Sequence, residues 1–169
     1  MNTTALPTPM HMLNDKWVLY HHLPSNKDWT LSGYEIVMND IDSVEKTVVL
    51  NETIPEDMIK YSMWFLMRKG VTPLWEDPTN VTGGNFSYKV VNKNVFEVWK
   101  NLFYMLCGGT LCVDPANNKY LNGITISPKK NFCILKIWLN TICNDPSIIV
   151  NIPNLTKHGS QFRKHGADI

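Results

Sequence analysis

The residues best suited to chemistry lie in one short loop, where an indole ring is adjacent to a carboxylate. Trp75 and Glu76 lie between Pro73 and Pro78, within residues 70–78. Because proline donates no backbone hydrogen bond and keeps the preceding residue extended, this stretch is expected to be a surface loop. A flat apolar ring suits stacking on a base, and a carboxylate suits hydrogen bonding to the edge of a base. We therefore expect half of a binding site for a purine base here.

The other half of such a site must come from elsewhere in the chain, and one candidate is a second tryptophan. Trp29 follows the polar turn of residues 24–28. A tryptophan in this position could equally begin a strand and cover the core, so the residue alone leaves both interpretations open. The pair His21 and His22 suggests a metal or acid–base site, but adjacent residues on a strand point to opposite faces. We therefore expect no ligand shared by the two imidazole rings.

Length and composition indicate a single globular domain. The chain has 169 residues, of which 44% are hydrophobic and 18% charged, and a formal net charge of +1. This balance excludes an overall basic field, so any contact with nucleic acid phosphates must be local. The frequent lysine and asparagine residues are typical of an A+T-rich coding genome, such as that of a protist or a large DNA virus.

Neither a targeting segment nor a metal site is evident. No run of about eighteen apolar residues occurs, so we expect no membrane span, and the first residues lack the pattern of a signal peptide. The four cysteines show no CxxC spacing, so reduced thiols in a cytoplasmic protein are expected. We expect a disordered tail over residues 1–10, one domain over residues 11–169, a flexible tail from about residue 153, a monomer, and no cofactor.

Alternating and apolar runs predict the elements that must position these residues. Helices are expected from Asp42, as a carboxylate cap with Glu45 three residues later, to about Leu50, over residues 55–60, and over residues 94–106 before a glycine pair. Strands are expected over residues 17–22, 31–38, 62–68, 85–91, 124–127, 133–139 and 148–152. Strands dominate, which predicts an α+β fold in which helices back an antiparallel sheet.

At this point several segments together resemble one family. The chain is similar to eukaryotic translation initiation factor 4E, the messenger RNA cap-binding protein, over roughly residues 11–152. The resemblance implies a curved antiparallel sheet with helices on its convex face and a cap-binding cleft on its concave face. The matching segments are residues 27–29, 42–45, 70–77 and 83–84, together with His11, Leu13, Trp17, Trp99, Gly108 and Trp138.

The resemblance also implies roles for the residues around the base. Trp29 and Trp75 match the two tryptophans that sandwich 7-methylguanine, and Glu76 matches the carboxylate that accepts hydrogen bonds from guanine N1 and N2. Trp138 matches the tryptophan that touches the N7-methyl group. Methylation makes the base cationic, so stacking on indole gains a cation–π contribution of ~1–2 kcal/mol. None of these roles requires a metal ion or a nucleophile.

The triphosphate of the cap would be held by cations from the hairpin of residues 128–131 and the strand after it. The candidates are Lys129, Lys130 and Lys136, and spacing alone does not rank them. The position where the family often has an arginine, after the glycine pair, is Asn85 here. A charge commonly available near the phosphates is therefore missing.

The convex face departs further from the family pattern, in which it binds a helical motif of a scaffold subunit or of binding proteins. His11, Leu13 and Val44 match that surface. Val48 occupies the position of a tryptophan, and Lys100 and Asn101 replace a Leu-Glu pair. Because a buried interface aromatic is often a binding hot spot, we expect altered contacts with such a partner.

Three alternatives stand beside a cap-binding initiation factor. The first is a translational regulator that binds caps without recruiting the usual scaffold. The second is an enzyme acting on capped RNA, which would need clustered carboxylates around a divalent metal; Glu76 and Asp77 are the only adjacent pair in the loop. The third is an interaction domain that has lost its ligand, against which the retained tryptophans and glutamate argue. We expect a protein without enzymatic activity.

Overall fold

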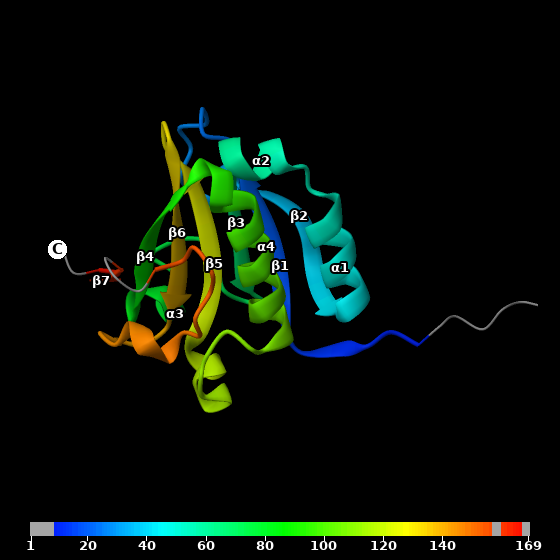
Figure 1. Ribbon diagram of the computed structural model, residues 1–169, viewed down its shortest axis with the longest axis vertical. Helices are drawn as coiled ribbons and strands as arrows, with labels where there is room; N and C mark the ends of the chain where they lie inside the picture. Colours follow the sequence, from blue (N-terminus) through cyan, green and yellow to red (C-terminus); the bar gives the residue numbers. More distant parts are fainter. Residues whose placement is uncertain (1–8, 157–159, 167–169) are drawn as a thin grey trace, which may run out of the picture.

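The computed structural model describes residues 9–156 and 160–166 as one antiparallel sheet with helices on one face (Figure 1). The α+β fold expected from the sequence is confirmed. The tail expected over residues 1–10 lies outside the described residues except for its last two. Within the described ranges, no helix is both long and apolar enough to cross a membrane.

Seven strands form the sheet in the order β2-β1-β3-β5-β6-β4-β7, and every neighbouring pair is antiparallel. Because side chains alternate between the two faces of a strand, residues at every second position share the same face. The strands are β1 Met12–His22, β2 Glu35–Ser43, β3 Met63–Arg68, β4 Gly84–Val91, β5 Leu121–Pro128, β6 Phe132–Leu139 and β7 Gln161–Lys164.

Helix α4, Asn92–Gly108, packs across the sheet and forms most of the core with it. Its buried side chains, among them Val95, Trp99 and Leu102, recur at helical spacing. The helix ends at Gly109, whose φ of 71° is the left-handed conformation that glycine adopts at least cost. The other helices are α1 Val44–Thr53, α2 Glu56–Tyr61 and the single turn α3 Pro78–Val81.

The expected cap of helix α1 is wrong in its details. Ser43, rather than Asp42, is the N-cap, and its hydroxyl accepts a hydrogen bond from the Lys46 N–H. Glu45 does not reach back to the cap residue; its carboxylate accepts hydrogen bonds from the backbone N–H of His11. The N-terminal end of β1 therefore uses the carboxylate that the sequence pattern assigned to the helix.

Two expected strands differ in the structure. Residues 31–38 begin with a 3₁₀ turn, Leu31–Gly33, before β2 starts. The prediction that residues 148–152 form a strand of the sheet is wrong, because this segment lies outside the sheet. Its backbone pairs with the loop after α4, through the bridge of Cys112 and Ile149, and follows a 3₁₀ turn over Pro146–Ile148.

The edge strand β7 lies in the segment that was expected to be a flexible tail. It pairs with β4, and Phe162 packs edge-on against Phe86 with ring centroids 5.4 Å apart. That aromatic contact supplies the burial that a short polar strand otherwise lacks. The C-terminal segment is therefore brought back onto the sheet, beside β4.

Candidate functional site

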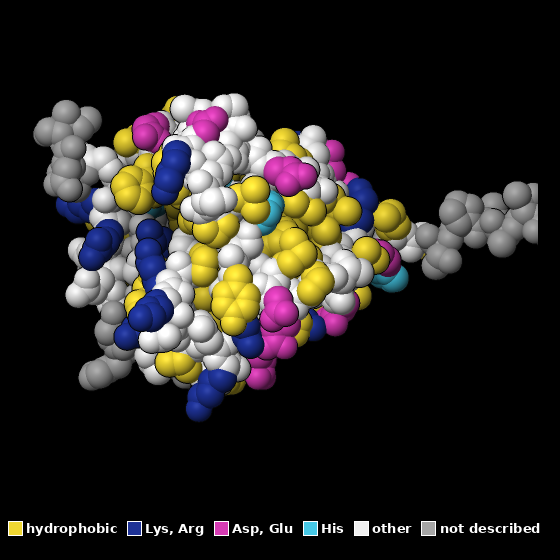
Figure 2. Space-filling view, turned by 90° about the horizontal axis from the view of Figure 1, so that it is seen from above, with side chains coloured by type: hydrophobic (Ala, Val, Ile, Leu, Met, Phe, Trp, Pro, Cys, Tyr) yellow, Lys and Arg dark blue, Asp and Glu magenta, His cyan; other side chains and the backbone are white. Residues whose placement is uncertain are grey.

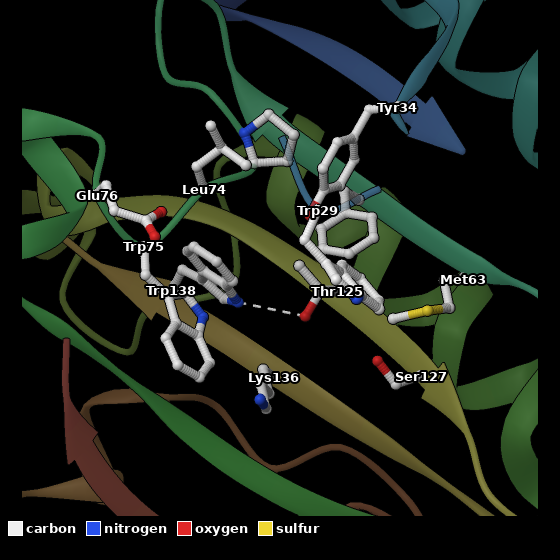
Figure 3. A pocket seen from close by; sticks show the side chains of 12 residues that line it. Trp29, Tyr34, Met63, Leu74, Trp75, Glu76, Thr125, Ser127, Lys136 and Trp138 are labelled. Atoms are coloured by element: carbon white, nitrogen blue, oxygen red, sulfur yellow. Dashed lines mark hydrogen bonds between the residues drawn. The ribbon is translucent and has the colours of Figure 1, made fainter. Parts of the chain in front are cut away.

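A cavity of about 350 Å³ lies against the sheet face opposite the helices, and three of the six tryptophans line it. They are Trp29, Trp75 and Trp138 (Figure 3). The other three tryptophans, Trp17, Trp64 and Trp99, are at most 3% exposed and belong to the core. Exposure therefore sets Trp29 and Trp75 apart from these three, whereas Trp138 lines the cavity although it is equally buried.

The loop that carries Trp29 is ordered by its own hydrogen bonds. The Asp28 carboxylate accepts from the N–H and hydroxyl of Thr30 and from the hydroxyl of Ser32, and these bonds lower the pKa of Asp28. A Cβ at Gly33 would lie 1.9 Å from the Asp28 carbonyl oxygen, so only glycine permits this close approach. Trp29, which is 52% exposed, therefore projects from a loop of defined shape.

His22 supports the Trp29 ring from one side. The two rings are stacked, with centroids 4.2 Å apart and planes 5° apart. The imidazole nitrogens lie 2.9 Å and 2.8 Å from the carbonyl oxygens of Leu23 and Asp28, which fix the orientation of the ring. Because His22 covers one face of the indole, the exposed part of Trp29 is its other face and its edges. The His21 ring lies against Trp64 instead, with centroids 4.6 Å apart.

The loop that carries Trp75 is held by a buried carboxylate. Asp77 accepts four hydrogen bonds of 2.8–2.9 Å from the N–H and hydroxyl groups of Thr72 and Thr79. Burial alone would raise the pKa of Asp77, but these bonds hold it below its ordinary value. The Asn80 side chain donates to the carbonyls of Thr72 and Leu74, which closes the loop around Trp75.

His165, just after β7, lies behind Trp75. The two ring planes are 10° apart with centroids 6.1 Å apart, and the His165 centroid lies 4.7 Å from that of Trp138. Nδ1 donates to the Asn80 carbonyl and Nε2 accepts from the Asn85 amide, so the ring is neutral. Burial lowers the pKa of His165, and the positive charge of Lys136 lowers it further. The hydrogen bond to the Asn80 carbonyl partly offsets this shift.

Glu76 lies on the rim of the cavity beside Trp75, and it forms no hydrogen bond or ion pair with another described residue (Figure 3). Burial and the charge of Glu76 raise the pKa of Tyr34, on the opposite side, to about 12. The phenol of Tyr34 therefore stays neutral. Because the Glu76 carboxylate has no partner among the described residues, both of its oxygens can accept hydrogen bonds from a ligand. In the described part of the chain, no three His, Cys, Asp or Glu side chains are grouped so that they could hold a metal ion.

Trp138 forms the floor between the two loops. It is 2% exposed, and its indole N–H donates to the Thr125 hydroxyl over 3.2 Å (Figure 3). This bond removes the polar edge of the ring from the cavity. Only a small apolar part of Trp138 is therefore available to a ligand.

The three candidate lysines separate in the structure. Lys136 lines the cavity, and its Nζ lies 5.6 Å from the Trp75 ring centroid. Burial, together with the charges of Arg163 and Lys129, lowers the pKa of Lys136. Lys129 lines a second, adjoining cavity, whereas Lys130 is exposed at the hairpin tip and lines neither.

Comparison with known proteins places these features in a family. The model of the family "Eukaryotic initiation factor 4E" matches residues 12–164. The chain belongs to this family. An initiation factor 4E homolog of Acanthamoeba polyphaga mimivirus is 41% identical over 64 residues, which are 38% of this chain and 24% of that protein. Initiation factor 4E-2 of Schizosaccharomyces pombe is 29% identical over 150 residues, 84% of this chain and 58% of that protein.

A solved structure shows the same fold. Schistosome initiation factor 4E, described as complexed with m7GpppG and 4E-BP, superposes with a TM-score of 0.71 at 24% identity, covering 83% of this chain and 78% of that one. The likeness at this identity concerns the fold. The chain spans less than two thirds of both curated relatives named above.

The convex face of this initiation factor 4E family member gathers the residues predicted for partner binding. Val44 and Val48 of α1 are 46% and 42% exposed, whereas Leu13 packs against the core. The His11 Nδ1 lies 2.6 Å from a Glu45 carboxylate oxygen. This contact holds the residue before β1 against the start of α1.

Helix α4 adds Lys100 and Asn101 to this face. The Lys100 Nζ lies 2.8 Å from the Glu52 carboxylate, whose other oxygen accepts from the Tyr104 hydroxyl. A carboxylate on α1 thus pairs with the lysine that follows Trp99. Sequence reasoning missed Glu52 because the contact joins residues 48 positions apart.

Other functional candidates were missed for similar reasons. His22 and His165 lie behind the tryptophan rings, and Asp77 holds the Trp75 loop, through contacts that no spacing pattern predicts. The only available signals were the position of His22 beside the Trp29 turn and that of Asp77 before a proline, which is typical of a helix cap.

Proposed function

We propose that this chain binds the 7-methylguanosine cap of messenger RNA and acts in translation initiation. The observation that carries the proposal is the pair Trp29 and Trp75, 52% and 56% exposed, which project from two separate loops into one cavity. Large aromatic side chains are costly to leave in water, and each of these is supported from behind by an imidazole ring.

Stacking explains the choice of a methylated base. A guanine between two indoles gains about 1–3 kcal/mol from each stacked ring. Methylation at N7 adds a positive charge, which is attracted to the electron-rich faces of both rings. The cavity volume of about 350 Å³ lies within the range of sites for small ligands.

Glu76 supplies selectivity for guanine in this proposal. Its unpaired carboxylate can accept hydrogen bonds from N1 and N2 of guanine, whereas adenine would leave it desolvated and without a donor. Trp138 contributes its apolar face to the methyl group. Lys136, at the edge of the cavity, and Lys129 beside it are the cations proposed for the triphosphate, and Lys130 is too peripheral to support that role.

The comparisons support this proposal. The schistosome relative in the family was solved with a cap dinucleotide and a 4E-binding protein. We propose by analogy that the α1–α4 surface of this chain binds a helical segment of a scaffold subunit or binding protein, with contacts altered at Val48, Lys100 and Asn101. We further propose a non-enzymatic, monomeric protein acting in the cytoplasm.

Retention on 7-methylguanosine resin tests the cap proposal. The protein should remain bound during a wash with GTP and elute with 7-methylguanosine triphosphate (m7GTP) at the same concentration. Elution by both nucleotides would mean that the site does not read the methyl group, and failure to bind the resin would contradict the proposal.

A further inference from the structure

A second cavity, of about 330 Å³, adjoins the first along strands β4, β6 and β7. The two cavities share Ser127 and Lys136, so they form one continuous depression on the sheet. We call the second cavity the basic groove. Among the described residues, its charged lining consists of Lys89, Lys129, Lys136 and Arg163, with no aspartate or glutamate.

The positive charges of the basic groove are not neutralised within the described part of the chain. There, none of the four groove cations pairs with a carboxylate, and what distinguishes them from the other unpaired lysines is that they line one hollow. The pKa of Lys136 is lowered by burial and by the charges of Arg163 and Lys129. Clustering like charges in a hollow costs free energy, which a bound polyanion would recover.

The cations extend well beyond the site of the base. Along the sheet, Trp138, Asn85 and Arg163 occupy neighbouring positions on β6, β4 and β7. Arg163 is thus two strands away from Trp138, or roughly 10 Å at the usual strand spacing. Lys89 is four residues from Asn85 along β4, roughly 13 Å at the usual rise. Gln161, opposite Ser87, lies between them and can donate hydrogen bonds, whereas the Ser87 hydroxyl donates to Oδ1 of Asn85.

Figure 2 shows Lys and Arg side chains gathered on the side of the molecule where Figure 1 places β4, β6 and β7. The net charge of the whole chain is only +1, so this concentration of cations is local. A groove of this kind, uniform in charge and open along its length, follows a backbone of repeated phosphates better than it encloses a single anion.

We propose that the basic groove binds the phosphodiester backbone of the first nucleotides that follow the cap, with Lys89 and Arg163 as the contacts farthest from the base. The inference rests on the proposed function, because the cap fixes one end of the RNA in the adjoining cavity. Lys136 and Lys129 serve the triphosphate, whereas Arg163, opposite Asn85 on β7, contacts the RNA beyond it. RNA is favoured over an acidic peptide because the groove continues directly from the stacking site.

The test compares m7GTP with a capped pentanucleotide RNA, by fluorescence titration at about 50 mM and 200 mM salt. The variant Lys89→Gln/Arg163→Gln removes both outlying charges while keeping polar side chains of similar length. Lys93→Gln, on the exposed start of α4, removes one charge outside the groove and serves as the control. Thermal melting checks that each variant is folded.

Wild-type protein should bind the capped RNA more tightly than m7GTP at low salt. With two phosphate contacts, this advantage should fall roughly sevenfold between the two salt concentrations. The double variant should lose the advantage and keep its m7GTP affinity, and Lys93→Gln should behave as wild type.

Three results would overturn the inference. Equal affinities of wild-type protein for the two ligands would do so, as would an advantage that persists in the double variant. An equal loss of affinity for both ligands in a folded double variant would assign Lys89 and Arg163 to the triphosphate instead. Wild-type protein that binds neither ligand would contradict the cap proposal itself, which separates the two failures.

Discussion

Replacing Trp29 with alanine tests the stacking site with little disturbance to the fold. The side chain is 52% exposed, and the hydrogen bonds of His22 to the carbonyls of Leu23 and Asp28 do not depend on it. The variant should therefore melt close to the wild-type temperature. Tyr61→Ala, which removes a 61% exposed aromatic ring on α2, outside the cavity, is a matched control.

The loss of affinity follows from the removal of one stacked face. One indole contributes about 2–3 kcal/mol to binding of a cationic base, so the m7GTP affinity should fall roughly 30- to 150-fold. About 1 kcal/mol of this depends on the N7 charge, so the preference for m7GTP over GTP should shrink roughly fivefold. Isothermal titration calorimetry with both nucleotides measures the two quantities. An unchanged preference in a folded Trp29→Ala variant would refute the sandwich.

Three further predictions concern the rest of the site. Glu76→Gln should weaken m7GTP binding by about 2 kcal/mol in calorimetry, because a charge-assisted pair becomes a mismatched amide. Unchanged affinity would show that the carboxylate does not contact the base. Asp77→Asn should lower the free energy of unfolding by about 2 kcal/mol at neutral pH. Because the folded pKa of Asp77 is lowered, its contribution is present above the unfolded pKa and is lost as pH falls through about 4 toward the folded value, so denaturant titrations of the two proteins should converge in acid. A gap that is constant down to pH 3 would exclude this role. Finally, the affinity for m7GTP should decline with salt more steeply than the affinity for 7-methylguanosine. Lys136→Gln should narrow the difference between these two salt dependences. Parallel salt dependences in the wild-type protein would exclude a phosphate role for Lys136.

The sequence was sufficient for the elements whose patterns are local. Helix α4 follows from apolar spacing and its terminal glycines, and β6 from an alternation that places Lys136 and Trp138 on one face. The loop of Trp75 follows from its prolines. These features depend on neighbours within a few residues, which the sequence contains.

Strand β7 could not be predicted because its stability is tertiary. Its four residues are mostly polar, and only the contact of Phe162 with Phe86 and the pairing with β4 fix it. Without the strand, the position of Arg163 opposite Asn85 and that of His165 behind Trp75 are not foreseeable. The sequence alone therefore could not place a cation next to Asn85.

The ranking of the lysines needed side-chain positions. Lys129 and Lys130 are adjacent in sequence and equally basic, but only Lys129 lines the basic groove. Which of two neighbouring lysines lines a cavity depends on the geometry of the hairpin turn, which spacing does not reveal. The same limit applied to Glu52, whose pairing with Lys100 depends on how α1 packs on α4.

Quenching of tryptophan fluorescence by m7GTP, compared with GTP, is the most direct test of the central claim that two half-exposed indoles enclose a methylated guanine. Stacking on Trp29 and Trp75 should quench the emission of the two exposed tryptophans, while the buried Trp17, Trp64 and Trp99 remain fluorescent. The account predicts saturable quenching by m7GTP at concentrations where GTP has little effect. Equal quenching by both nucleotides, or none by either, would contradict it.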